Sequence, residues 1–167
     1  MRKSFSKPKT VSQTGRSPMD AALRFLGVRA RTIREVERHL DACEYGEIEI
    51  AETIQRLIEL NLLNDMAFAE DFIQTRLATK PISRARLREQ LRAHEVEGNA
   101  AEQALQLVSD DTESDSAGKI AGKYARQYQE LSKEKRDEMI LRRLLSRGYS
   151  YEDARAAIVE ATEEYDE

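Results

Sequence analysis

The sequence is poor in residues that interrupt helices. Its 167 residues include seven Gly and three Pro, and two of the prolines, Pro8 and Pro18, lie close to the N-terminus. It has no Trp, and no stretch alternates polar residues with Val, Ile or Thr in the manner of a strand. The body is rich instead in Ala, Leu, Glu, Arg and Gln. This composition predicts an all-α fold.

Several functional classes have little support in the sequence. Cys43 is the only cysteine, which excludes an intrachain disulfide or a cysteine metal cluster and fits a reducing, cytoplasmic compartment. No apolar run approaches the roughly 18 residues that a membrane span needs. The two histidines, His39 and His94, lie far apart, and no Gly-rich phosphate loop, Gly-x-Ser-x-Gly turn or His-Glu-x-x-His helix occurs. We therefore expect no enzyme, cofactor or metal, and no membrane partner.

Charge is unevenly distributed. Residues 1–19 contain five basic residues and no acid, so this segment carries +5 and leaves −9 for the rest of the net −4. The segment is also Ser-rich and contains two prolines and a glycine, which predicts a disordered basic tail. Because the body is acidic, any contact with nucleic acid must come from a local patch or from the tail.

The most informative pattern is an internal repeat. Leu40, Leu91 and Leu144 lie 51 and 53 residues apart. The same shifts align four further sets of apolar residues: Val36 with Leu87 and Ile140, Tyr45 with Val96 and Tyr149, Ile54 with Leu105 and Ile158, and Leu57 with Val108 and Ala161. A period of about 50 residues is typical of stacked units that bury a shared core and present a long surface to a partner. The repeat favours a binding protein, which we expect to be a monomer.

Helix-start signals divide the body into about nine helices. Thr32 with Glu35, Asn99 with Glu102, and Ser150 with Asp153 have the spacing of capping boxes, and Ser83 and Ser132 precede two further apolar stripes. These signals predict three tandem three-helix repeats in an elongated, curved array. The predicted boundaries are a tail at 1–19, repeats at 20–63, 64–110 and 117–163, and an acidic linker at 111–116.

Three segments resemble the RecX regulatory family. They are RTIREVERHL at 31–40, NDMAFA at 64–69 and RGYSYEDA at 147–154. The resemblance extends from about Asp20 to Ala161 and includes the three-by-three arrangement of helices. It implies a small helical modulator without catalysis that binds the RecA recombinase filament on DNA and most often inhibits it. The middle repeat departs from the family pattern, with Ser83 in place of a usual glycine and His94-Glu95 in place of a Lys-Gly turn.

Arginine clusters are the candidate contacts with RecA or DNA, because guanidinium groups bind phosphates and carboxylates through paired hydrogen bonds. Arg34 and Arg38 share a helix face with Arg31, and Arg84, Arg88 and Arg92 are spaced by four. The complete candidate set is Arg29, Arg31, Arg34, Arg38, Arg84, Arg86, Arg88, Arg92, Arg142, Arg143 and Arg147. The alternative is that these side chains form ordinary surface salt bridges.

Two further alternatives remain open at this point. Tyr124 and Tyr128 lie one helical turn apart, so they either belong to the core or stack on bases as in proteins that bind single strands. The basic faces do not repeat, since a shift of 51 places Arg88 on Glu37. This favours one composite partner over a repetitive DNA reader. An independent DNA-binding protein that uses the arginine clusters and the tail is the second functional hypothesis.

Overall fold

A computed structural model describes residues 17–96 and 98–163. Within these ranges the chain forms helices and no strand, which confirms the all-α prediction. The nine helices of the described residues are α1 (Pro18–Leu26), α2 (Ile33–Ala42), α3 (Glu47–Glu59), α4 (Asp65–Thr79), α5 (Arg84–Ala93), α6 (Asn99–Leu105), α7 (Asp110–Gln127), α8 (Lys133–Leu145) and α9 (Tyr151–Thr162).

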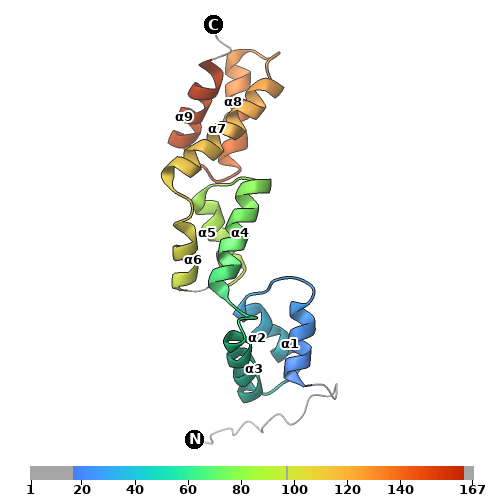
Figure 1. Ribbon diagram of the computed structural model, residues 1–167. Coiled ribbons are helices and arrows are strands. Elements are labelled where there is room, and N and C mark those ends of the chain that lie inside the picture. The colour runs from blue at the N-terminus through green and yellow to red at the C-terminus, as the bar shows by residue number, and fades with distance from the viewer. Residues whose placement is uncertain (1–16, 97, 164–167) are drawn as a thin grey trace, which may run out of the picture.

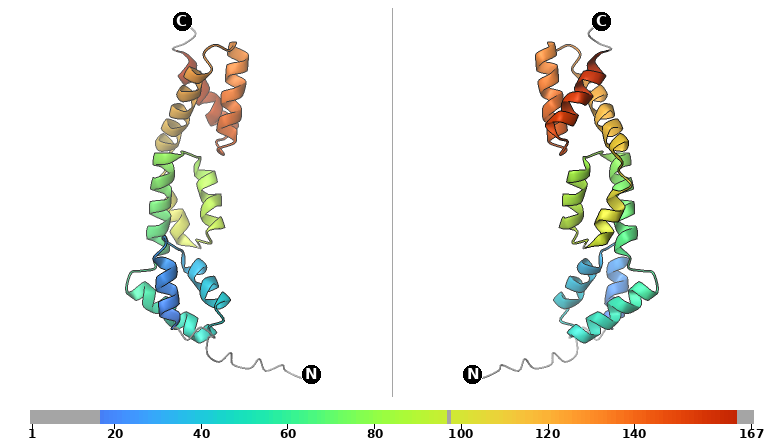
Figure 2. Two further views of the ribbon diagram at one scale, coloured as in Figure 1. Left: turned by 90° about the vertical axis from the view of Figure 1, so that its right-hand side faces the viewer. Right: turned by 90° about the vertical axis from the view of Figure 1, so that its left-hand side faces the viewer.

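The helices form three units that follow one another along a single axis (Figures 1 and 2). The first unit contains α1–α3, the second α4–α6 and the third α7–α9. All helix pairs with extensive contact belong to the same unit. The elongated arrangement follows from this, because each unit contacts only its neighbours along the chain.

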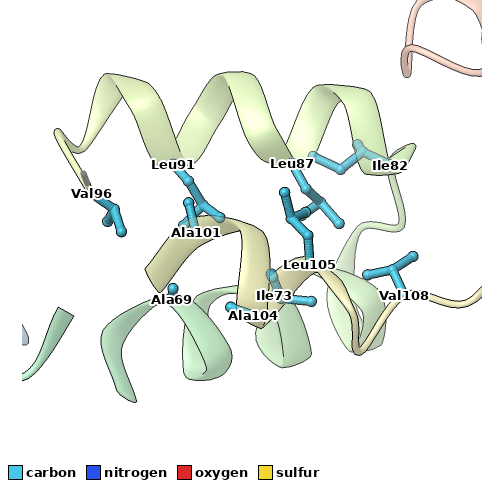
Figure 3. Packing of buried hydrophobic residues seen from close by; sticks show 10 residues of the cluster. All are labelled: Ala69, Ile73, Ile82, Leu87, Leu91, Val96, Ala101, Ala104, Leu105 and Val108. Atoms are coloured by element: carbon cyan, nitrogen blue, oxygen red, sulfur yellow. The ribbon is translucent and has the colours of Figure 1, made fainter. Parts of the chain in front are cut away.

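Each unit has its own apolar core, and the repeat columns seen in the sequence occupy these cores. Leu40, Leu91 and Leu144 are all fully buried, one in each cluster. Figure 3 shows the second core, where Leu87 and Leu91 of α5 point toward α4 and α6. Burying one such leucine stabilises the fold by about 1.5–3 kcal/mol. The periodicity therefore reports packing inside a unit.

Serine and threonine caps begin several of the helices at the expected places. The hydroxyl oxygens of Thr32, Ser83 and Ser150 each accept a backbone N–H from the first turn of the helix that follows. Ser132 precedes α8 as expected, although its side chain makes no capping hydrogen bond. These caps satisfy donors that the helix itself leaves free, which fixes where each helix begins.

Two expectations about local structure are wrong, and a third lies mostly outside the described residues. The predicted linker at 111–116 is helical, because Ser109 caps α7 and the acidic side chains that follow stabilise the positive end of its dipole. Asn99 is the first residue inside α6, and Gly98 occupies the cap position. The predicted tail overlaps α1, which begins at Pro18, while residues 1–16 lie outside the described part of the chain.

The first junction joins the start of α2 to the end of α5. Thr32 Oγ1 donates a hydrogen bond of 2.9 Å to the carbonyl oxygen of His94 and accepts the N–H of Glu35 at 3.2 Å. The Ile33 N–H donates to Asp65 Oδ1 at 2.9 Å. A carboxylate of the second unit thus satisfies a free donor at the start of a first-unit helix.

The second junction repeats this construction between the second and third units. The N–H of Ser83 donates to the carbonyl oxygen of Arg147 at 3.1 Å. The N–H of Arg84 donates to Glu113 Oε1 at 2.9 Å. Ser83 lies 51 residues after Thr32, and both are fully buried polar residues. The capped start of α2 therefore lies against the turn that follows α5, and the capped start of α5 lies against the turn that follows α8.

The turn after the middle helix of each unit contains a residue with the left-handed backbone conformation. Glu44, Glu95 and Gly148 follow α2, α5 and α8 and have φ values of 64°, 56° and 88°. Gly148 approaches the preceding unit most closely, since a Cβ built on it would lie 2.6 Å from Ser83 Oγ and 2.9 Å from Arg86 Cβ. Glycine is required there by space, and its φ of 88° also lies beyond the values that Glu44 and Glu95 adopt.

Candidate interaction surfaces

The first arginine cluster surrounds the junction between the first and second units. Glu35 Oε1 lies 3.2 Å from an Arg29 nitrogen and 3.1 Å from His94 Nδ1, and Glu35 Oε2 lies 3.8 Å from Arg31. Arg38 pairs with Glu95 at 2.6 Å across the same junction. The Arg38–Glu95 and Glu35–His94 contacts join the two units, whereas Arg29 and Arg31 pair with Glu35 inside the first unit. A phosphate would have to displace a carboxylate to bind any of these arginines.

Glu35 is the centre of this cluster. Its side chain is only 11% exposed. Burial alone would raise its pKa, but hydrogen bonds from His94 and Arg29 outweigh burial and leave the pKa below its ordinary value. The carboxylate is therefore held in its charged form. Glu35 does not close the capping box expected with Thr32, because its side chain is directed to these partners.

The second cluster lies on α5 and is also paired with acids. Arg84 pairs with Asp110 at 2.5 Å and lies 3.6 Å from Glu113. Arg88 makes two hydrogen bonds to Glu102, at 2.8 and 3.1 Å. The Glu102 hydrogen bond raises the pKa of Arg88, and the same bond lowers the pKa of Glu102. This face of the second unit is a network of charge pairs.

A polar groove runs beside these pairs, between α5 and the segment that leads into α7. Its volume is about 470 Å³, and Arg84, Arg88, Leu105, Val108 and Asp110 contribute to its lining. The groove brings Arg84 and Arg88 to one place on the surface, as the spacing of four predicts. Their carboxylate partners leave little uncompensated positive charge in it.

The eleven candidate arginines fall into two groups within the described residues. Eight form ion pairs with carboxylates: Arg29, Arg31, Arg34, Arg38, Arg84, Arg86, Arg88 and Arg142. Arg92, Arg143 and Arg147 form none there. Arg92 and Arg143 are exposed and Arg147 is half-buried. These three side chains offer the least compensated positive charge among the candidates.

Arg143 and Arg147 belong to an aromatic and cationic patch on the third unit. Tyr124 of α7 and Tyr128, the residue that follows α7, stack with ring centroids 5.7 Å apart and planes at 19°. The guanidinium carbons of Arg143 and Arg147 lie 5.4 and 5.6 Å from the Tyr124 ring centroid, and Lys123 Nζ lies 5.8 Å from it. We call these five residues the Tyr–Arg patch.

The patch has an unusual electrostatic balance. Arg147 donates a hydrogen bond of 3.3 Å to the Tyr124 hydroxyl, and this bond lowers the pKa of Tyr124. A hydrogen bond with Tyr128 raises the pKa of Arg143. No described carboxylate pairs with Lys123, Arg143 or Arg147. The positive charge here faces aromatic rings and solvent.

Sequence reasoning found only part of this patch. Lys123 was absent from the candidate set, and the helical spacing of Tyr124 and Tyr128 fits a core stripe as well as a surface. The structure places both rings half-buried at the edge of the third core. The one available signal was the four-residue step between two tyrosines in a chain with only six.

The described residues offer no group of three metal-ligating side chains. Cys43 Sγ lies 4.0 Å from His39 Nε2, one helical turn away, and the His39 ring stacks on Phe25 at 4.1 Å. In the same part of the chain, no helix is both long and apolar enough to cross a membrane.

Comparison with protein families gives two matches along the chain. Residues 19–57 match the family model of the first three-helix domain of RecX, and residues 64–105 match that of the second three-helix domain. The chain is 28% identical over 151 residues to the regulatory protein RecX of Listeria welshimeri. That alignment covers 90% of this chain and 56% of the relative, so the chain spans about half the length of the curated relatives it matches.

Solved structures give the same result. The crystal structure of RecX from Lactobacillus salivarius is similar to this chain with a TM-score of 0.77 and 31% identity, over 86% of this chain and 94% of that one. A second crystal structure, of a regulatory protein RecX, has a TM-score of 0.71 at 20% identity and supports the fold alone. It covers 86% of this chain and 70% of its own.

Proposed function

The chain belongs to the RecX family, and from that premise we propose that it regulates the RecA recombinase by binding the RecA filament on DNA and lowering its activity. The proposed action is non-enzymatic. A regulator of this kind needs a long surface that contacts several parts of a filament, rather than a closed substrate site.

One observation carries the proposal beyond family membership: the three units share their cores and junctions but not their surfaces. Leu40, Leu91 and Leu144 are equivalent and buried. By contrast, Arg88 is equivalent to Glu37, so charge changes sign between equivalent positions. Units that read a uniform duplex would carry cations in the same column. Units adapted to protein and DNA in one filament need different surfaces.

The proposal is tested by measuring the rate of ATP hydrolysis by RecA on single-stranded DNA while this protein is added at increasing ratios to RecA. We expect the rate to fall as the ratio of this protein to RecA rises. An unchanged rate at every ratio would rule out the proposed regulation.

A pair of charge-reversal variants tests which surface takes part. Arg92 is exposed on α5 and has no ion pair with a described residue, so Arg92→Glu should weaken inhibition without unfolding the chain. Arg155→Glu on α9 is the matched control, because Arg155 is also exposed and has no ion pair within the described residues. Equal effects of the two substitutions would remove α5 from the proposed contact surface.

Independent DNA binding is the second candidate function. It is favoured by Arg92, Arg143 and Arg147, which form no ion pair with a described carboxylate. A protein that works in this way binds DNA without RecA, and its affinity falls steeply as salt rises because phosphate contacts release counterions.

A further inference from the structure

The Tyr–Arg patch contains two aromatic side chains at positions where the equivalent helix end of the second unit has none. A shift of 48 residues aligns α4 with α7, since it places Asp65 on Glu113 and Ala69 on Ala117. Asp65 and Glu113 each accept a backbone N–H from the first turn of a helix in the preceding unit. Ala69 and Ala117 are both buried. The two helices are therefore equivalent along their length.

The same shift shows what the second unit has at the positions of the tyrosines. Tyr124 corresponds to Arg76 and Tyr128 corresponds to Lys80. The second unit thus has long cationic side chains at both positions, with Arg76 half-buried and Lys80 exposed. Both rings pack against the edge of the third core, but the second unit shows that a three-helix unit also forms without aromatic residues at these two positions.

The contacts of the patch distinguish the two rings. Three cations lie over or beside Tyr124, within 5.8 Å of its ring centroid. Tyr128 stacks on Tyr124 and is the C-terminal cap residue of α7. Tyr124 is thus covered by cations on several sides. Tyr128 is held by Tyr124, by the third core and by a hydrogen bond with Arg143, and the exposed part of its half-buried ring is what a planar ligand would contact.

The neighbouring cations define the charge of that ligand. Lys123 and Arg143 are exposed and form no ion pair with a described carboxylate. Single-stranded nucleic acid has this chemistry, because each nucleotide places a planar base beside an anionic phosphate. Duplex DNA offers the same phosphates, but its bases are already stacked and closed to an aromatic side chain.

We propose that the Tyr–Arg patch binds single-stranded DNA, with Tyr128 stacked on an unpaired base and Lys123 and Arg143 bound to adjacent phosphates. Tyr124 and Arg147 position these groups. This site rests on the second candidate function, independent DNA binding, and assigns to it the residues and the kind of strand that they bind.

Fluorescence anisotropy with a labelled oligo(dT) strand and no RecA tests the site. The full chain should bind oligo(dT) more tightly than a duplex of the same length at the same salt concentration. Tyr128→Leu should weaken binding to oligo(dT) by about 5- to 100-fold, the usual effect of losing one base–aromatic stack. Tyr128→Phe keeps the ring but loses the hydroxyl that bonds to Arg143, so it should weaken binding by less than Tyr128→Leu does.

Arg143→Gln and Arg142→Gln form the matched pair for the phosphate contacts. The two residues are neighbours on α8, but Arg142 pairs with Glu138 and lies outside the patch. Arg143→Gln should weaken oligo(dT) binding and reduce its salt dependence, and Arg142→Gln should change neither by more than about twofold. Circular dichroism of each variant checks that helicity is retained.

Cross-linking gives an independent readout of position. A strand that carries 5-iodouracil should form its photochemical cross-link within the α7 segment that contains Tyr128. Three results would overturn the proposal: no oligo(dT) binding by the unchanged protein, equal binding by Tyr128→Leu, or equal competition by an acidic peptide. Because RecA is absent, failure of this site leaves the ATP hydrolysis test unaffected.

Discussion

Thr32 donates a hydrogen bond of 2.9 Å to the carbonyl oxygen of His94, 62 residues later in the chain, and so links the first unit to the second. The same hydroxyl accepts the N–H of Glu35. One buried oxygen therefore caps a helix and joins two units. Junctions of this kind set the relation between neighbouring units, since their apolar cores are separate.

Replacing this hydroxyl should destabilise the chain more than loss of an ordinary cap. Thr32→Val keeps the shape of the side chain but leaves the Glu35 N–H and the His94 carbonyl without this partner. We expect a loss of about 2–3 kcal/mol in the free energy of unfolding, measured by urea titration. Ser17→Ala removes an exposed cap and should cost about 1 kcal/mol. Equal losses would contradict the joining role of Thr32.

Gly148 should tolerate no side chain. Alanine there adopts φ near 88° only with strain, and its Cβ would lie 2.9 Å from Arg86 Cβ. We expect Gly148→Ala to lower the free energy of unfolding by about 1–3 kcal/mol.

Gly118→Ala is the control for that substitution. Gly118 lies inside α7, and an added Cβ would meet no atom within 4 Å. Alanine favours the helix over glycine by about 1 kcal/mol, so this variant should be more stable than the unchanged chain. Thermal unfolding measures both variants. A stable Gly148→Ala protein would contradict the close approach at the second junction.

Glu35 should make stability depend on pH on the acid side. Its pKa is lowered in the folded chain from an ordinary value of 4.5 because hydrogen bonds from His94 and Arg29 outweigh burial. The stabilisation is therefore present above pH 4.5 and is lost as pH falls through the folded pKa. Glu35→Gln should lower stability at neutral pH and flatten the acid side of the profile. An unchanged profile from pH 3 to pH 6 would contradict this account.

Tyr149 should have the opposite pH behaviour. Burial raises the pKa of its hydroxyl to about 12, and the described residues provide no hydrogen-bond partner for that hydroxyl. The group is protonated in both states well below pH 10, and stability falls as pH rises through 10 toward 12. Tyr149→Phe should keep or increase stability at neutral pH and reduce this alkaline loss.

Val96 supports the expectation for Tyr149, because it occupies the equivalent place in the second unit without a hydroxyl. Urea titrations at pH 7 and pH 10.5 would measure the effect. A clear loss of stability at pH 7 would mean that the hydroxyl has a partner after all.

The sequence predicted the parts of the fold that depend on local chemistry. Apolar spacing located the residues that fill each core, and Thr32, Ser83 and Ser150 marked helix starts correctly. It failed at 111–116, where acidic residues resemble a loop in composition but suit the first turns of a helix capped by Ser109. The same residue types serve both roles, so composition alone does not separate them.

Interaction surfaces were harder to predict because some pairing partners come from other units. Arg84 pairs with Asp110 and Glu113, which lie 26 and 29 residues away in the next unit. No helical spacing contains this information. The exposure of Tyr128 likewise depends on how α7 meets α8, which a four-residue step does not define.

The most direct test of the account compares binding of this protein to RecA filaments on single-stranded DNA with binding to the same DNA alone. Fluorescently labelled protein would be titrated with each at low and at moderate salt. The account predicts much tighter binding to the filament, and a preference for the filament that grows as salt weakens the contact with bare DNA. Equal affinity for filament and bare DNA at both salt concentrations would contradict it.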